Sequence, residues 1–167
     1  MNNEIQQIEE GLSKLTPGFL PLSIFLQVAH HTVTPTVEFV ALRKTQNSVE
    51  VFLTRRPKDD AIWPNMLHIP GSVIRSSDQE GSFVDAFKRV LHDEMGDPTL
   101  VMQPTFYKFL FHQVKRGREI AFIHWAEVVG EIAKGEFYDI AHLPADMVDH
   151  QKSFVIEVGE YFLSQNK

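Results

Sequence analysis

The chain of 167 residues contains no cysteine. Disulfide scaffolds and thiolate metal sites are therefore excluded, and the composition is compatible with a reducing cytosol. It also lacks any apolar run that approaches the roughly 20 residues needed to cross a bilayer, and its first residues are polar rather than signal-like. We expect a soluble, cytoplasmic protein that has no membrane partner.

Basic residues are in the minority. The chain has 16 Lys+Arg against 22 Asp+Glu, which gives a formal net charge of −6. Because no basic face offsets this charge, we expect no nucleic-acid partner. The hydrophobic content of 43% is enough for one globular core. No repeat, low-complexity stretch or linker is present, so residues 1–167 are predicted to form a single domain.

Two helices are predicted before the first strand. An apolar stripe with three- and four-residue spacing predicts a surface helix with one buried side over residues 3–15: Ile5, Ile8, Leu12 and Leu15. A Pro-Gly pair ends this helix, and a second short helix is predicted to begin at Pro21. Residues 1–32 are therefore expected to form an N-terminal helical extension that packs on the domain.

Short β-branched and apolar runs predict two hairpins. Residues 37–44 and 49–54 form the first hairpin, and residues 106–114 and 119–129 form the second. We interpret the basic turn of the second hairpin, residues 115–118, as a solvated loop. Near the end of the chain, a strand followed by a helix with a periodic apolar face completes a mixed α/β domain.

Residues 67–96 are the most informative stretch of the chain. Their pattern predicts a strand, a glycine, a polar loop and an acidic helix. Ser82 and Asp85 resemble a capping box at the start of this helix. Its apolar residues recur at three- and four-residue spacings, and Gly96 is a typical C-terminal residue. Asp93 and Glu94 are predicted to lie on one face of the helix.

The end of this helix, residues 89–96, resembles the signature of the Nudix hydrolases, which runs Arg-Glu-aliphatic-any-Glu-Glu-any-Gly after a glycine and a spaced glutamate. Four residues match this pattern: Arg89, Leu91, Glu94 and Gly96. Asp93 is a conservative acid. The resemblance implies an α/β/α sandwich in which a mixed β-sheet lies between the signature helix and the C-terminal helix.

The sequence departs from the signature at several positions. Val90 stands where the family has a glutamate, and we expect it to leave an apolar surface beside the site. The upstream glutamate position falls on Gly81, one residue after Glu80. The loop between Gly71 and the helix is longer than in the family pattern.

The resemblance also implies a chemistry. Diphosphate hydrolysis needs charge neutralisation, which Mg²⁺ or Mn²⁺ supplies through carboxylate and phosphate oxygens. Asp93 and Glu94 are the expected metal ligands, with Glu80 as a third. Arg89 is expected to orient a carboxylate of the site. Glu136 is a loose candidate for an additional base or ligand.

Residues 51–71 resemble the segment that precedes the signature in the family. Arg56 ends a predicted strand, and two interpretations remain open: a solvated strand end, or an arginine that pairs with phosphate or with an acidic residue of the signature helix. His68 and Gly71 are further candidates for substrate binding, because they lie where the strand enters the loop.

Two functions of different classes follow from the resemblance. The first is a divalent-metal-dependent Nudix phosphohydrolase that cleaves a nucleoside diphosphate linked to another moiety. The alternative is a catalytically inactive Nudix-fold module that binds a nucleotide-like ligand or a protein partner, and Val90 and Gly81 favour it. The amphipathic N-terminal helices also suggest a homodimer.

Overall fold

Strand β1 (Val33–Lys44) is the centre of the sheet, and its side chains are buried on both faces. Phe39 and Ala41 point to one face while Val40 and Leu42 point to the other, and all four are fully buried. The strand pairs in parallel with β7 (Gly117–Val129) and antiparallel with β2 (Val49–Arg55). The structure, a computed structural model, describes residues 3–46 and 48–165.

The sheet is mixed and has the strand order β3-β2-β1-β7-β5, with β4, β6 and β8 pairing with β1, β7 and β2 respectively. The remaining strands are β3 (Leu67–His68), β4 (Gly71–Val73), β5 (Thr99–Leu100), β6 (Thr105–Val114) and β8 (Glu136–Asp139). Both predicted hairpins are present, as β1–β2 and β6–β7. A short 3₁₀ turn η2 (Ile140–His142) follows β8.

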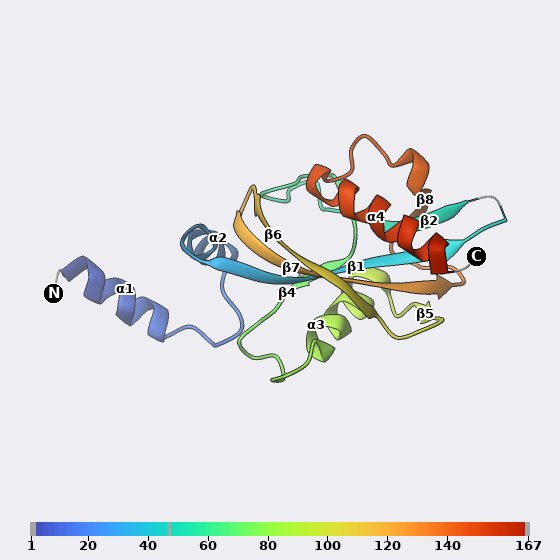
Figure 1. Cartoon of the computed structure of the whole chain (residues 1–167). Coiled ribbons are helices and arrows are strands. Elements are labelled where there is room, and N and C mark those ends of the chain that lie inside the picture. Colours follow the sequence, from blue (N-terminus) through green and yellow to red (C-terminus); the bar gives the residue numbers. More distant parts are fainter. Residues whose placement is uncertain (1–2, 47, 166–167) are drawn as a thin grey trace.

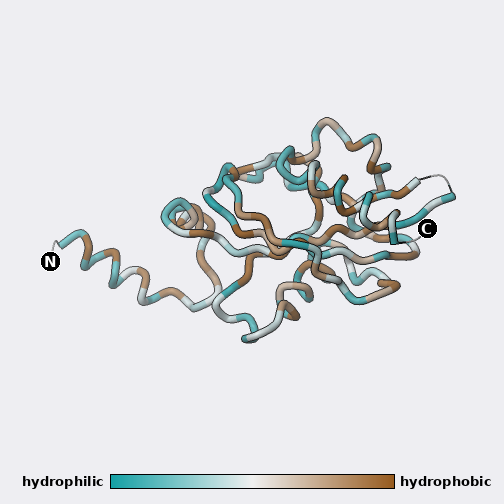
Figure 2. The backbone as a smooth tube through the Cα atoms, viewed as in Figure 1, coloured by the Kyte–Doolittle hydropathy of each residue, from teal (hydrophilic) through white to brown (hydrophobic). Residues whose placement is uncertain are grey.

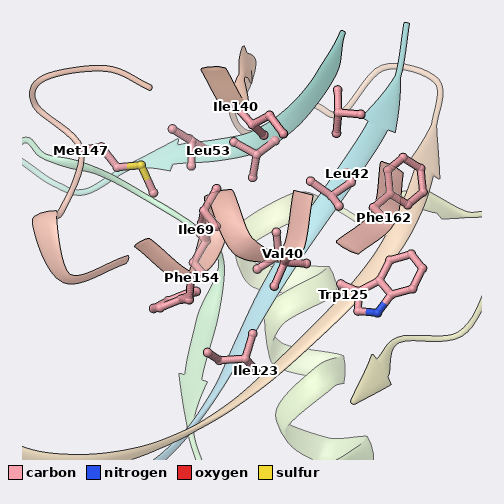
Figure 3. Packing of buried hydrophobic residues seen from close by; sticks show 14 of the residues in the cluster. Val40, Leu42, Leu53, Ile69, Ile123, Trp125, Ile140, Met147, Phe154 and Phe162 are labelled. Carbon is pink, nitrogen blue, oxygen red and sulfur yellow. The ribbon is translucent and has the colours of Figure 1, made fainter. Parts of the chain in front are cut away.

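Helices cover both faces of the sheet (Figure 1). Helix α4 (Asp149–Gln165) packs against the face that carries Val40 and Leu42, and Figure 3 shows Phe154 and Phe162 beside them. Helix α3 (Val84–Arg89) and the π-helical segment η1 (Val90–Met95) pack against the opposite face, which carries Phe39 and Ala41. The predicted α/β/α sandwich with a mixed β-sheet is confirmed.

The signature helix differs from the prediction at its start and in its middle. Ser82 does not cap it, because Phe83 occupies the cap position and the Ser82 hydroxyl is buried without a hydrogen-bond partner among the described residues. Asp85 instead accepts a hydrogen bond from the Gln79 amide, at 2.9 Å. The helix then widens into η1 and ends, as predicted, at Gly96 with φ 75°.

Val90 does not border a solvent-facing site. Its side chain is fully buried in the cluster that includes Phe39, Phe52 and Met95. The expectation that Val90 leaves an apolar surface beside the site is therefore wrong: the side chain contributes to the core. The residue that departs most clearly from the signature stabilises the contact between helix and sheet.

The two N-terminal helices differ in their packing on the domain. Helix α2 (Leu22–His31) packs against β7 and β1, and Ala29 is buried there. Helix α1 (Asn3–Ser13) has no buried residue and extends away from the domain (Figure 1). Hydrophobic and hydrophilic residues alternate along α1 (Figure 2), and its apolar residues Ile5, Ile8 and Leu12 are exposed. The predicted buried side of the first helix is thus absent from the described structure, and only the second helix packs on the domain.

No helix within residues 3–46 and 48–165 is long and apolar enough to cross a membrane.

The burial of Val90 predicts the effect of restoring the signature residue. In Val90→Glu, a carboxyl group replaces an apolar side chain in the core, and we expect the free energy of unfolding to fall by at least about 3 kcal/mol. Val84→Glu is the matched control, because Val84 begins the same helix and is 48% exposed. We expect it to change stability by no more than about 0.5 kcal/mol. If urea denaturation showed the same loss of unfolding free energy for both variants, the assignment of Val90 to the core would be contradicted.

Candidate functional site

A polar cavity of about 50 Å³ lies where the side of β1 facing α4 changes from apolar to polar residues. Thr36 and Glu38 continue the row of Val40 and Leu42 but point into the cavity. The other charged or polar residues that line it come from several segments of the chain: Arg56, Trp63, His68, Ser72, Arg116, Glu119, His150 and Gln151. The cavity therefore combines several ionisable groups in one small space.

Glu38 lies at the centre of this group. Its Oε2 accepts a hydrogen bond from Nε2 of Gln151 at 3.0 Å, and Oε1 of Gln151 accepts one from the Ile69 amide at 3.1 Å. Burial, followed by the negative charge of Glu119, raises the pKa of Glu38 to about 8. Glu38 consequently holds a proton at neutral pH and contributes no full negative charge to the cavity.

Gly71 brings a second carboxylate to the edge of the cavity. It pairs with Glu38 across β4 and β1, and a Cβ atom at Gly71 would lie 3.0 Å from Glu38 Oε2 and 3.1 Å from the Val37 carbonyl oxygen. The Gly71 amide donates to Glu94 Oε2 at 3.3 Å. Burial raises the pKa of Glu94 to about 7. Only a glycine fits comfortably between these groups.

Arg56 is held in place by Asp60. Nε and Nη2 of Arg56 donate to Asp60 Oδ2 at 2.9 and 2.7 Å, and Oδ1 of Asp60 accepts from the amides of Ile62 and Trp63. Partial burial opposes ionisation of Asp60, but these hydrogen bonds, above all those from Arg56, lower its pKa to about 2. The aspartate remains charged and fixes both Arg56 and the loop that carries Trp63.

Arg116 approaches the same tryptophan. The guanidinium carbons of Arg56 and Arg116 lie 5.4 and 5.6 Å from the Trp63 ring centre, in the range of cation–π contacts. Arg116 also forms an ion pair with Glu119, which is almost completely buried. The interpretation of the second hairpin turn as a solvated loop is therefore wrong for Arg116, whose side chain is only 16% exposed.

Two buried polar atoms at the cavity lack partners. Among the described residues, no group accepts from Nε of Arg116, and none bonds to Oγ1 of Thr36. Buried polar atoms are nearly always hydrogen-bonded in folded proteins, to protein or to a bound molecule. These two atoms therefore have unused hydrogen-bonding capacity, but the surrounding side chains cover them.

The histidines of the cavity are neutral. Burial lowers the pKa of both His68 and His150 to about 4, with further lowering from Arg56 in the first case and from His112 and Arg116 in the second. At neutral pH the positive charge at the cavity thus comes from the arginines and not from the imidazole rings.

No family model matches the sequence, and no curated protein matches it either. Solved structures do match the fold. The MutT Nudix hydrolase from Burkholderia pseudomallei is 17% identical, with 75% of this chain and 97% of that chain covered and a TM-score of 0.56. The Nudix domain of Shewanella oneidensis NrtR, complexed with ADP ribose, is 16% identical, with 86% and 99% covered and a TM-score of 0.58. The chain has the Nudix fold.

A third Nudix-type similarity is to the Ap4A hydrolase from C. elegans, at 15% identity, with 79% of this chain and 99% of that chain covered and a TM-score of 0.57. At this level of identity the comparisons establish the fold, as the resemblance in residues 89–96 implied. Fold alone does not fix chemistry, so function depends on the residues at the site.

Four of the residues predicted from the Nudix resemblance are brought together. Arg56, His68 and Gly71 line the cavity, and Glu94 reaches its edge through the Gly71 amide. For Arg56, the two interpretations that remained open were a solvated strand end and an arginine that pairs with phosphate or with an acidic residue of the signature helix; its acidic partner is Asp60, which is not on that helix. The position of Arg56 beside the cavity favours the second.

Four other predicted residues lie elsewhere. Asp93 and Glu80 are exposed. Both terminal nitrogens of Arg89 donate to Asp78 at 2.7 Å, so Arg89 holds the enlarged loop rather than orienting a carboxylate of its own helix. Glu136 accepts from the Tyr138 hydroxyl beside a different cavity.

The predicted metal site does not fit the structure. Within residues 3–46 and 48–165, no three histidine, aspartate or glutamate side chains are grouped so that they could hold a metal ion. Of the proposed ligands Asp93, Glu94 and Glu80, only Glu94 lies at the cavity. The arrangement lacks the clustered carboxylates that the Nudix signature implies.

The sequence argument missed Glu38, Glu119, Arg116 and Gln151. One signal was available: Glu38 is a single acidic residue inside the apolar run of β1, where a charge is rare unless it has partners. Arg116 and Glu119 gave no such signal, because charges beside a hairpin turn are ordinary. Only the parallel pairing of β1 with β7 brings these residues to Glu38.

The raised pKa of Glu38 predicts a pH dependence of stability. Between its ordinary value of 4.5 and its folded value of about 8, the folded state keeps a proton that the unfolded state loses. The contribution of Glu38 to stability is therefore complete below pH 4.5 and is lost as the pH rises through 8. We expect Glu38→Gln, which keeps the shape, to gain a few kcal/mol relative to wild type across this window in denaturation curves measured from pH 5 to pH 9.

Glu160→Gln is the matched control, because Glu160 is exposed on α4. It should show the same pH profile as wild type. The low pKa values of His68 and His150 act in the opposite direction below pH 6.5, but they do so in all three proteins and cancel in the difference. A constant difference between Glu38→Gln and wild type would contradict the protonated state of Glu38.

Proposed function

We propose that the protein is a catalytically silent Nudix-fold module that binds the diphosphate group of a nucleoside diphosphate derivative. The observation that carries this proposal is the pair of guanidinium groups, Arg56 and Arg116, at one buried polar cavity. The carboxylates that a Nudix hydrolase needs for metal are not grouped there. Anion recognition is thus better supported than metal-dependent hydrolysis.

The charges at the cavity suit an anion. Arg56 and Arg116 are always positive and present donors in a planar fork that matches phosphate oxygens. The negative charge of Glu119 is paired with Arg116, and Glu38 is protonated at neutral pH. Arg56 is likewise paired with Asp60, so the two guanidinium groups supply donors for an oxyanion without giving the cavity a net positive charge.

The size of the cavity limits which part of the ligand enters. A water molecule needs about 10–15 Å³ of such space, so about 50 Å³ admits a group of phosphate size but not a nucleoside. Trp63 is 6% exposed and lies against both arginines, so its ring supports the guanidinium groups rather than stacking on a base. The nucleoside is expected to lie outside the cavity.

ADP-ribose is the first probe to use. It contains a diphosphate linked to a nucleoside and a second sugar, and it is the ligand in the structure of the similar NrtR Nudix domain. The proposal requires that it bind to this chain when divalent metal has been removed, because no part of the argument uses a metal.

The second candidate is the divalent-metal-dependent phosphohydrolase, in which Mg²⁺ or Mn²⁺ assists cleavage of the diphosphate. Glu38 and Glu94 favour it, because both carboxyl groups adjoin Gly71. Nudix hydrolases among the similar structures also show that this fold supports such activity in other proteins. Two carboxylates are fewer ligands than the signature provides, which places this candidate second.

Calorimetric titration of ADP-ribose in the presence of EDTA tests the proposal. We expect Arg56→Gln to raise the dissociation constant at least about tenfold, a loss of roughly 1.4 kcal/mol, because it removes a charged phosphate donor. Arg55→Gln is the matched control: Arg55 is the adjacent residue and also pairs with an aspartate, Asp146, but does not line the cavity. Its dissociation constant should stay within about threefold of wild type.

Absence of ADP-ribose binding in EDTA would contradict the proposal, and so would either of two further results. One is binding with EDTA that Arg56→Gln and Arg55→Gln weaken equally. The other is binding that requires Mn²⁺ and is followed by hydrolysis of ADP-ribose, with both lost in Glu94→Gln. The second result would establish the phosphohydrolase instead.

A further inference from the structure

Helix α1 carries an apolar side that nothing in the described chain covers. Ile5, Ile8 and Leu12 recur on one face of the helix and are 50%, 62% and 45% exposed. The helix has 11 residues and buries none of them. Isolated helices shorter than about 12–15 residues are marginal in water, so α1 needs a surface to pack against.

An apolar groove begins where α1 ends. Its volume is about 570 Å³, and its wall is formed by the last turn of α1, the following segment, α2, the start of β1 and residues 73–76 at the end of β4. The groove adjoins the stripe of α1, because Leu12 belongs to both and Leu15, just after the helix, also lines the groove. Phe19, which is 63% exposed, lines it on the side of the connecting segment.

The segment between α1 and α2 holds α1 outside the groove of its own chain. Gly18 has φ +84°, and a Cβ atom there would lie 2.1 Å from Ser77 Oγ, so the backbone is seated closely against the loop after β4. This contact fixes the direction in which α1 leaves the domain, and the helix projects away from it (Figure 1). Only the C-terminal end of α1 touches the groove, while Ile5 and Ile8 point into solvent.

We propose that the groove receives helix α1 of a second copy of this chain. The arrangement is a two-fold exchange in which each copy inserts the stripe of α1, centred on Ile8, into the groove of the other. Such an isologous interface closes on itself and covers both exposed apolar surfaces at once. A second copy is favoured over other occupants because the same chain presents both halves of the contact.

The charges beside these surfaces agree with the exchange. Glu9 lies next to the apolar stripe in the helical arrangement of α1, and Arg75 lies on the groove wall. Insertion of α1 from a second copy brings acidic and basic residues to the same rim. The groove is also separate from the anion cavity, so the proposed dimer does not depend on the proposed ligand.

Sedimentation velocity of the full chain from about 1 μM to about 100 μM tests the exchange. We expect a reversible dimer in wild type. Ile8→Glu should raise the dimer dissociation constant at least about tenfold, because it places a charge in the apolar groove. Gln7→Glu adds the same charge on the side of α1 away from the stripe and should stay within about threefold of wild type. Both positions are exposed, so folding, checked by circular dichroism, is retained.

A groove variant separates helix exchange from simple pairing of two α1 helices. Phe19→Glu should also weaken the dimer, and a mixture of Ile8→Glu and Phe19→Glu should associate better than either alone. The mixed dimer keeps one intact contact, between α1 of the Phe19→Glu chain and the groove of the Ile8→Glu chain. A wild type that stays monomeric, an Ile8→Glu dimer as tight as wild type, or no effect of Phe19→Glu would each overturn the proposal.

Discussion

Burial of β1 on both faces is the constraint on which the rest of the structure depends. Its apolar residues alternate between the two helical layers, and β2, β4 and β7 all pair with it directly. On the α4 side the apolar row stops at Glu38, where the core gives way to the cavity. A carboxyl group at that position must be hydrogen-bonded and protonated, which Gln151 and the surrounding burial provide.

Three residues of the signature segment do not contribute to the cavity. Val90 packs in the core, Arg89 holds the enlarged loop through Asp78, and Asp93 faces solvent. Glu94 alone still reaches the site, through Gly71. The arginines of the cavity are positioned by different elements, the end of β2 and the β6–β7 turn. The arginines of the proposed anion site therefore come from different elements than the predicted metal ligands Asp93 and Glu94.

Much of the fold was predictable from the sequence, because local patterns encode it. The β1–β2 and β6–β7 hairpins, the C-terminal helix and the stop at Gly96 follow from periodicity and turn residues. The site was predictable only in part. Arg56, His68, Gly71 and Glu94 lie near the family's signature, whereas Arg116 and Glu119 meet Glu38 only through long-range pairing of strands. The π-helical register of η1 and the uncovered side of α1 likewise depend on tertiary contacts that no local pattern records.

A crystal structure of the chain with ADP-ribose, grown in the presence of EDTA, tests the central claim most directly. The account predicts diphosphate oxygens in the cavity, within hydrogen-bonding distance of the Arg56 and Arg116 guanidinium groups, and the nucleoside outside it. An empty cavity, with the ligand seated instead beside the exposed Asp93 on the signature helix, would contradict the account.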